Sequence, residues 1–240
     1  LITSRRYFTD KVIGDAHVDK GRGIWAAKPQ DVPNHIFKAW SDLAIPSSGD
    51  LQEIVSRIRG SWAIQFPFTL ATPYLSKGIE AFDLLENPIL RDKVYEVPIV
   101  PSSSWKGGLR AAAMMLCDGN ERDERIIRLF GNERKADSGF QAGRLHCFPT
   151  GFQKTACEVI NPHDRARRVG TNPILLECVP PDQTGTFTVL YVPFGEVKTG
   201  EVSTDLTLCA AAIRDLLLEW GIGAKKSNGN GLAKDGLSNG

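Results

Sequence analysis

The spacing of apolar residues changes along this chain, and this change restricts its fold more than any other feature. Between residues 62 and 70 every second residue is apolar, which is typical of a strand with one buried face. A helix is expected at 103–117. A second apolar strand is expected at 185–194, and after it apolar residues recur every three to four positions, as in a helix. Those positions are Leu206, Ala210, Ile213, Leu217 and Trp220. The sequence therefore predicts two strand–helix units in an α+β fold.

The remaining segments complete a recognisable topology. A short strand is expected at 143–148, and extended pieces at 155–160 and 172–179 flank a polar, arginine-rich stretch. These two pieces predict a projecting hairpin with a basic tip, and the glycine-rich tail is expected to close the sheet. Without the hairpin the order is β-α-β-β-α-β, the ferredoxin-like arrangement. Pro67 predicts an edge position or a bulge in the first strand.

Composition indicates a globular protein and excludes several other classes. A chain of 240 residues can bury a real core, and it has no apolar run of about eighteen residues, which a membrane span requires. Its first residues lack the apolar stretch of a secretion signal. A net charge of +1 argues against a non-specific coat on nucleic acid. The five cysteines form no C-x-x-C motif, so reduced thiols in a cytoplasmic protein are expected.

The first part of the chain is less regular than the rest. Residues 1–60 are expected to form an N-terminal extension of unknown role, followed by a ferredoxin-like domain at 61–240. One helix is expected in the extension at 49–59, with Asp50 as its cap. Residues 71–96 predict a long loop, and such loops in compact domains are usually functional or disordered.

Residues 97–110 (VPIVPSSSWKGGLR) predict a site for a phosphate-bearing ligand. A short strand ends at Pro101, a triple-serine turn follows, and a helix begins at Trp105. Hydroxyl groups beside the free N–H groups of a helix start favour an anion. Lys106 and Arg110 are four residues apart, so both project from one helical face and add positive charge. The alternative is a well-capped amphipathic helix whose lysine is merely solvated.

Residues 221–231 (GIGAKKSNGNG) form a second segment suited to phosphate. Its glycines allow the backbone to approach a ligand closely, and Lys225 and Lys226 place charge beside exposed N–H groups. It is not a Rossmann fingerprint, because it follows a helix, and it lacks the Walker pattern. The alternative for this segment is a flexible tail.

Three motifs in this order resemble those of the RAMP superfamily of CRISPR-associated proteins. The family pattern P-x-I-P-G-S-S-x-K-G-x-x-R corresponds to residues 98–110, with Ser102 in place of its glycine. The pattern L-F-G…G-R-L corresponds to 129–131 and 143–145, and the glycine-rich loop to 221–231. More narrowly, the chain resembles the guide-RNA-binding backbone or end-capping subunits of type III effector complexes, which are Csm- and Cmr-like.

This resemblance implies a modified ferredoxin-like (RRM-like) fold that holds CRISPR guide RNA by its backbone. The expected partners are guide RNA, target RNA paired with the guide, and other effector subunits in a hetero-oligomer. RNA contact is implied for Ser103, Ser104, Lys106, Arg110, Lys225, Lys226 and Asn228. The family's thumb hairpin corresponds to residues 158–177, and it would place Arg165, Arg167 and Arg168 against phosphates and kinked bases. The alternative for these arginines is a solvated surface loop.

The resemblance leaves catalysis open. Catalytic backbone subunits carry D-x-P-x-x-x-D in the loop after the first strand, and residues 86–92 match it with Glu86 in place of the first aspartate. Asp83 is nearby but offset. Metal-assisted cleavage depends on the placement of carboxylates within a fraction of an ångström, so a non-catalytic subunit without a cofactor is expected. The alternative is an endoribonuclease that cleaves target RNA with Mg²⁺ and Glu86 or Asp83.

Two further hypotheses stay open. A metal-independent endoribonuclease that processes precursor guide RNA would use a general-base histidine, for which His163 is the candidate. A protein-only scaffold would cap the assembly and hardly touch RNA, so its RNA affinity would respond little to salt.

Overall fold

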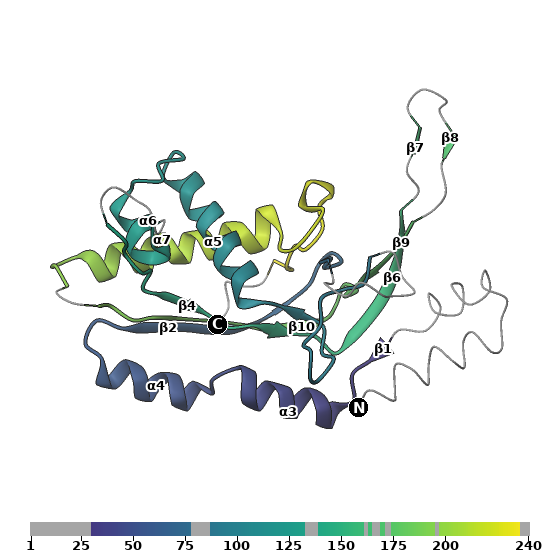
Figure 1. Ribbon diagram of the computed structural model, residues 1–240, viewed down its shortest axis with the longest axis horizontal. Coiled ribbons are helices and arrows are strands. Elements are labelled where there is room, and N and C mark those ends of the chain that lie inside the picture. The colour runs from purple at the N-terminus through teal and green to yellow at the C-terminus, as the bar shows by residue number, and fades with distance from the viewer. Residues whose placement is uncertain are drawn as a thin grey trace.

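Helices lie on both sides of a small antiparallel sheet, and a hairpin projects from one end of it (Figure 1). The computed structural model describes residues 30–77, 87–132, 139–160, 163–164, 169–170, 174–194 and 197–235. None of the helices in these ranges is long and apolar enough to cross a membrane. In chain order the elements are β1 (Gln30–Asp31), α3 (Asn34–Ala44), α4 (Ser48–Arg57), β2 (Trp62–Thr69), β3 (Ile99–Val100), α5 (Ser102–Leu116), α6 (Glu124–Phe130), β4 (Leu145–Cys147), β5 (Thr150–Gly151), β6 (Lys154–Ile160), β7 (His163–Asp164), β8 (Val169–Gly170), β9 (Ile174–Cys178), β10 (Thr184–Tyr191), α7 (Glu201–Asp215), the π turn η1 (Leu216–Trp220) and the 3-10 turn η2 (Lys226–Asn228).

The central sheet has the strand order of a ferredoxin-like fold. β10 pairs antiparallel with β2 on one side and with β4 on the other, and Pro67 lies in β2 at the edge of this three-stranded sheet. The C-terminal tail joins the outer edge of β2 through a bridge between Leu70 and Ala233 and a 2.8 Å hydrogen bond from the Lys234 N–H to Thr69. The order is therefore tail–β2–β10–β4, with α5 and α7 as crossover helices. This arrangement confirms the predicted β-α-β-β-α-β topology and the closing role of the tail.

The main core lies between the sheet and α5 and α7, which cover one of its faces (Figure 1). The alternating apolar side chains of β2 pack in this layer, as their spacing predicts. Trp62 stacks on Tyr191 with ring centroids 4.9 Å apart, and Phe187 meets Trp105 of α5 edge to face at 4.8 Å. The indole N–H of Trp105 also donates to Thr150 at 3.1 Å. These contacts hold the first turns of α5 in place on the sheet.

The other face of the sheet is covered by α3 and α4 (Figure 1). α4 begins with a capping box, in which Ser47 accepts from the Asp50 N–H and the Asp50 carboxylate accepts from the Ser47 N–H at 2.9 Å. The helix predicted at 49–59 is confirmed, but the predicted cap is wrong, because Ser47 is the cap and Asp50 its reciprocal partner. The amide of Gln65 in β2 donates to the Pro46 carbonyl at 3.0 Å and ties the start of α4 to the sheet.

α3 is a helix that the sequence pattern did not reveal. Trp40 of α3 is 2% exposed, and its ring lies so close to Gly151 that a Cβ at that position would overlap with it. Val32 and Val97 complete this small cluster. The helix therefore owes its position to tertiary contacts with distant residues. The domain division at residue 60 stays a prediction.

α7 buries only part of the predicted face, and Ile213 lies in the core as predicted. Leu206 is 37% exposed and Ala210 is exposed, whereas Asp205 and Cys209 are fully buried. The helix continues into the π turn η1, which carries Leu217 into the core. The second core helix is confirmed, but the assignment of Leu206 and Ala210 to its buried face is wrong, because a buried carboxylate occupies that face.

The two pieces of the L-F-G…G-R-L motif lie side by side and join α6 to β4. A Cβ on Gly143 would overlap with the backbone of Phe130, so only glycine permits this approach. The Arg144 N–H then donates to the Arg128 carbonyl at 2.8 Å. The motif is therefore a packing junction, and it leads both arginine side chains into the interior.

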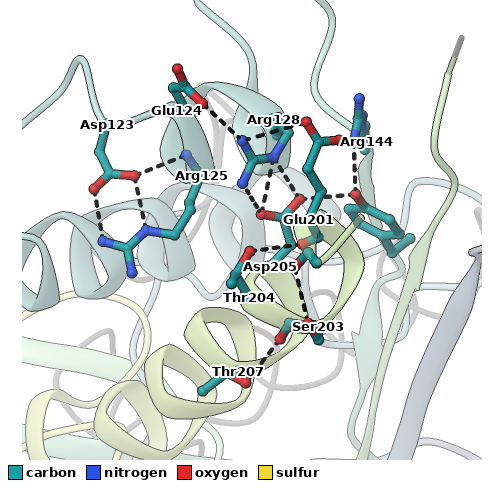
Figure 2. Close-up of polar contacts among 12 residues, drawn as sticks. Asp123, Glu124, Arg125, Arg128, Arg144, Glu201, Ser203, Thr204, Asp205 and Thr207 are labelled. Carbon is teal, nitrogen blue, oxygen red and sulfur yellow. Dashed lines mark hydrogen bonds and ion pairs between the residues drawn. The ribbon is translucent and has the colours of Figure 1, made fainter. Parts of the chain in front are cut away.

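Arg128 and Arg144 form a buried ionic cluster with α7 (Figure 2). Arg128 binds Asp205 through two nitrogen atoms, and the shortest N–O distance is 2.7 Å. Tyr191 donates to Asp205 at 2.9 Å, and Arg144 donates to Tyr191 and to Glu201 at 3.1 Å each. Burial works to raise the pKa of Glu201, but the hydrogen bond from Arg144 and the charges of both arginines hold it below its usual value. This cluster links α6, α7 and β10.

The predicted hairpin is formed by β6 and β9, which pair antiparallel, and β7 and β8 extend it away from the sheet (Figure 1). β1 pairs with β6 and adds a third strand at its base. The arginines predicted at the tip (Arg165, Arg167 and Arg168) and the side chain of His163 lie outside the described residues. Their roles stay predictions.

In the part of the chain that the structure describes, no cysteine forms a disulfide bond. Burial raises the pKa of Cys147, Cys178 and Cys209 to about 12. These three thiols therefore stay protonated and poorly nucleophilic at neutral pH.

Candidate functional site

A cavity of about 410 Å³ opens between three segments that are far apart in the sequence. One wall is formed by Tyr74, Ser76 and Lys77, which follow β2. The second wall is the start of α5, and the third is the loop that follows η1. The helix start and the glycine-rich tail, each predicted from the sequence to suit phosphate, therefore meet at one cavity in the structure.

The wall from α5 is hydroxyl-bearing and has an open helix end. The helix spans Ser102–Leu116, which confirms the helix expected at 103–117. The expected triple-serine turn before Trp105 is wrong, because the serines form the first turn of the helix itself. The cap position is held by Pro101, and no side chain in the described part of the chain caps it. The expectation of a well-capped helix is therefore wrong, and Ser104 faces the cavity from a helix start that carries the positive end of the dipole.

The two glycines of α5 have different surroundings. A Cβ on Gly108 would lie 3.1 Å from a methyl carbon of Leu216, so this glycine lets α5 and η1 approach closely. A Cβ on Gly107 would meet no described atom within 4 Å. Glycine inside a helix costs about 0.5–1 kcal/mol relative to alanine, and no packing contact of Gly107 requires it. Its backbone lies open toward the cavity.

The loop that follows η1 is fixed against the wall after β2. Gly223 has a φ of +85°, and a Cβ on it would overlap with the carbonyl oxygen of Leu75. The Ala224 N–H donates to that same carbonyl at 2.7 Å, and the Gly231 N–H donates to Pro73 at 2.9 Å. These bonds favour a structured loop over the flexible tail that was the alternative.

The floor of the cavity is a small polar network. The Leu90 N–H donates to the Ser76 hydroxyl at 2.8 Å, and the Tyr74 hydroxyl donates to the Ile99 carbonyl at 3.2 Å. Burial raises the pKa of Tyr74 to about 12, so its phenol stays protonated at neutral pH. This part of the cavity is therefore uncharged, and the charge of the cavity comes from lysine side chains at its opening.

Lys77 and Lys226 supply that charge. Both side chains are exposed, and no carboxylate lines the cavity in the part of the chain that the structure describes. Two cations, a hydroxyl and a helix start around one cavity favour an anionic ligand with several oxygens. Sequence reasoning missed Lys77 because it falls in the long loop after β2, where a lysine beside Gly78 was the only local signal.

The residues predicted to contact RNA divide into two groups. Ser104 and Lys226 line the cavity. Ser103 is exposed in the same helical turn as Ser104, and Lys225 and Asn228 are exposed in the same loop as Lys226. These five residues therefore lie in or beside the cavity walls.

Lys106 and Arg110 form the second group and do not line the cavity. α5 packs against β4, and Lys106 lies close enough to that strand for its charge to act on His146. Burial and the charge of Lys106 lower the pKa of His146 in β4. The structure therefore does not bring Lys106 together with the glycine-rich loop.

The candidate acids are only partly placed. Asp83 and Glu86 lie outside the described residues, so their catalytic role stays a prediction. Asp92, the last residue of the matched pattern, accepts hydrogen bonds from the Val94 and Tyr95 N–H groups at 2.9 Å each and stabilises a turn. The described ranges contain no group of His, Cys, Asp and Glu side chains placed to hold a metal ion.

Comparison with known families and curated proteins agrees with the motifs. The model of the family described as the RAMP superfamily matches residues 11–234. A curated relative, the CRISPR system Cms endoribonuclease Csm3 of Streptococcus thermophilus, is 29% identical over 90 residues, or 35% of this chain. The match spans 40% of the length of that relative.

Two solved structures share the fold. A chain from the cryo-EM structure of the type III-B Cmr-beta bound to cognate target RNA has a TM-score of 0.59 at 19% identity, covering 85% of this chain and 67% of that one. A chain from the type III-B Cmr-beta in the apo state has a TM-score of 0.51 at 10% identity, covering 72% and 96%. At these identities the similarity shows the fold.

Proposed function

Because the chain belongs to the RAMP superfamily, we propose that it binds the sugar–phosphate backbone of CRISPR guide RNA at the cavity between α5 and the glycine-rich loop. In this proposal it is a backbone or end-capping subunit of a cytoplasmic type III effector complex. Its partners are the guide RNA, the target RNA that pairs with the guide, and other effector subunits. The printed names support this, since the curated relative belongs to a CRISPR system and one of the two Cmr-beta structures contains target RNA.

The observation that carries the proposal is the composition of the cavity. Lys77 and Lys226 attract a phosphate, the Ser104 hydroxyl donates a hydrogen bond to it, and the bare backbone at Gly107 permits close approach. With no carboxylate among the described lining residues, an RNA strand meets no repulsion there. None of these groups reads a base edge, so binding is expected to be independent of sequence.

The remaining predicted contacts continue the path of the strand beyond the cavity. An RNA strand that leaves the cavity over the first turn of α5 reaches Ser103. It then reaches the side of α5 that carries Lys106 and Arg110. On the opposite rim it passes Lys225 and Asn228. The projecting hairpin of β6 and β9 is the thumb in this proposal, and its arginines contact RNA beyond this path.

The proposal is tested by filling the cavity without charging it. Gly107→Leu puts a side chain into the open space, and Gly49→Leu is a matched control on α4, on the far side of the sheet, where a Cβ would meet only Ser47 at 3.7 Å. Both changes favour their helices. We expect Gly107→Leu to weaken binding of single-stranded RNA roughly tenfold, equivalent to about 1.4 kcal/mol, and Gly49→Leu to leave it unchanged. Equal affinities for the two variants would place RNA elsewhere.

Cleavage of target RNA is a second candidate function, because the curated relative is named an endoribonuclease. In this case Asp83 or Glu86 would supply carboxylate ligands for Mg²⁺, which would activate the nucleophile or stabilise the leaving group. The assembled complex would cut labelled target RNA in the presence of Mg²⁺, and a variant with Asp83→Ala and Glu86→Ala would not. Products that persist in this variant would remove both acids from the mechanism.

A further inference from the structure

Residues 87–92 lie between the cavity and the projecting hairpin and contact both. The Leu90 side chain lines the cavity, and the Leu90 N–H donates to the Ser76 hydroxyl at 2.8 Å. One residue earlier, the Ile89 N–H donates to the carboxylate of Glu177 in β9 at 2.9 Å. Two successive backbone N–H groups therefore point to the two different sites.

Glu177 is the contact point on the hairpin. Its side chain is 1% exposed and forms an ion pair with Arg91, whose side chain is 11% exposed. Its N–H donates to the Asn87 carbonyl at 3.0 Å, so backbone and side chain hold the same segment. Arg91 reaches further to Thr155 in β6 at 3.3 Å. One buried pair therefore joins the segment to both strands of the hairpin base.

A second connection runs through the wall after β2. The Leu75 side chain packs with Leu176 and Cys178 of the hairpin, while its carbonyl accepts the N–H of Ala224 in the glycine-rich loop. The glycine-rich loop and the hairpin therefore share one wall. A change in the position of that wall affects both.

We infer that the buried Arg91–Glu177 pair couples occupancy of the cavity to the position of the projecting hairpin, with Glu177 as the positioning residue. The ligand in this inference rests on the proposed function. An apolar pair of similar volume would stabilise the base of the hairpin about as well. What the ion pair adds is a fixed orientation, because its hydrogen bonds hold Arg91 and Glu177 in one geometry. Because coupling is reciprocal, RNA that orders Ser76 and Leu90 also orders the hairpin.

The ligand-free part of the test uses amide hydrogen exchange of the full chain. Glu177→Gln keeps one oxygen for the Ile89 N–H but loses the charge that pairs with Arg91. It should speed exchange of the Leu90 amide and of the β9 amides about fivefold or more. Glu53→Gln is the matched control, because Glu53 forms an exposed ion pair with Arg57 in α4. This control should change the exchange of neither the Leu90 amide nor the β9 amides. Exchange in Glu177→Gln equal to wild type would overturn the coupling.

The RNA part uses single-stranded oligouridylate as the probe. In the wild type, protection should appear both in residues 221–231 and in β6 and β9, and in Glu177→Gln only in residues 221–231. Protection of the hairpin that is the same in both proteins would overturn the inference. A wild type without protection anywhere would refute the proposed function, and the ligand-free comparison would still decide the coupling. If Glu177→Gln does not fold, the double variant Arg91→Gln with Glu177→Gln removes both charges and should show the same loss.

Discussion

Ser104 and Lys226 line the same cavity, although one lies on α5 and the other near the end of the chain on η2. The closure of the sheet brings them together. The Leu70–Ala233 bridge fixes the end of the glycine-rich loop on β2, and the Gly221 N–H fixes its start through a 2.8 Å bond to the Leu216 carbonyl. The cavity is therefore a product of the complete ferredoxin-like topology, and neither segment forms it by itself.

The two glycines of α5 should respond differently to alanine. Gly107→Ala should raise the free energy of unfolding by about 0.5–1 kcal/mol, because it improves helix propensity where there is open space. Gly108→Ala should raise the free energy of unfolding by less, because the new Cβ would lie 3.1 Å from the Leu216 side chain. Urea denaturation measures both. Equal gains would contradict the assigned contact with Leu216.

The buried cluster of α6 and α7 should be sensitive to loss of one partner. Asp205→Ala removes the bidentate partner of the buried Arg128 guanidinium, which keeps only longer ion pairs with Glu124 at 3.5 Å and Glu201 at 4.0 Å. The free energy of unfolding should therefore fall by about 3–5 kcal/mol. Asp42→Ala is the control, because Asp42 and Lys38 form an exposed pair on α3, and its loss should cost about 1 kcal/mol or less. Urea unfolding that ranks the two variants equally would show that the cluster does not hold α6 and α7 together.

Acid should remove the contribution of Asp123, the cap of α6. Hydrogen bonding from the Arg125 side chain, opposed by burial, lowers the pKa of Asp123 from 3.8 to about 2. A carboxyl with a lowered pKa contributes its stability fully above the unfolded value and loses it as pH falls toward the folded value. The stability difference between wild type and Asp123→Asn should therefore shrink as pH falls from about 4 to about 2. Urea midpoints measured across this range decide the point, and a difference that is independent of pH would contradict it.

Local spacing was sufficient to predict the central sheet. The period of two in β2 reflects burial of one face by α5 and α7. The apolar run of β10 reflects burial on both faces, because every residue from Phe187 to Tyr191 is buried. The two segments that form walls of the cavity could also be located from the sequence, because their glycines, hydroxyls and lysines stand out there. That they bind phosphate stays a prediction. Their convergence followed from the topology.

Features that depend on a single distant partner could not be predicted. α3 packs where it does because Trp40 fits against Gly151. α7 buries the Asp205 carboxylate because Arg128 binds it in the interior. The spacing of Lys106 and Arg110 predicts a shared helical face, but it does not show which part of the molecule that face meets. The structure shows that neither residue lines the cavity.

The most direct measurement of the central claim is the salt dependence of RNA affinity. Each lysine that neutralises a phosphate contributes about 0.7 to the slope of log K against log salt for a single strand. A variant with Lys77→Ala and Lys226→Ala should therefore lose about 1.4 from this slope. The control with Lys38→Ala and Lys234→Ala, which removes as much charge away from the cavity, should keep the wild-type slope. A wild-type slope in the Lys77/Lys226 variant would contradict the account, because RNA would then not be held between α5 and the glycine-rich loop.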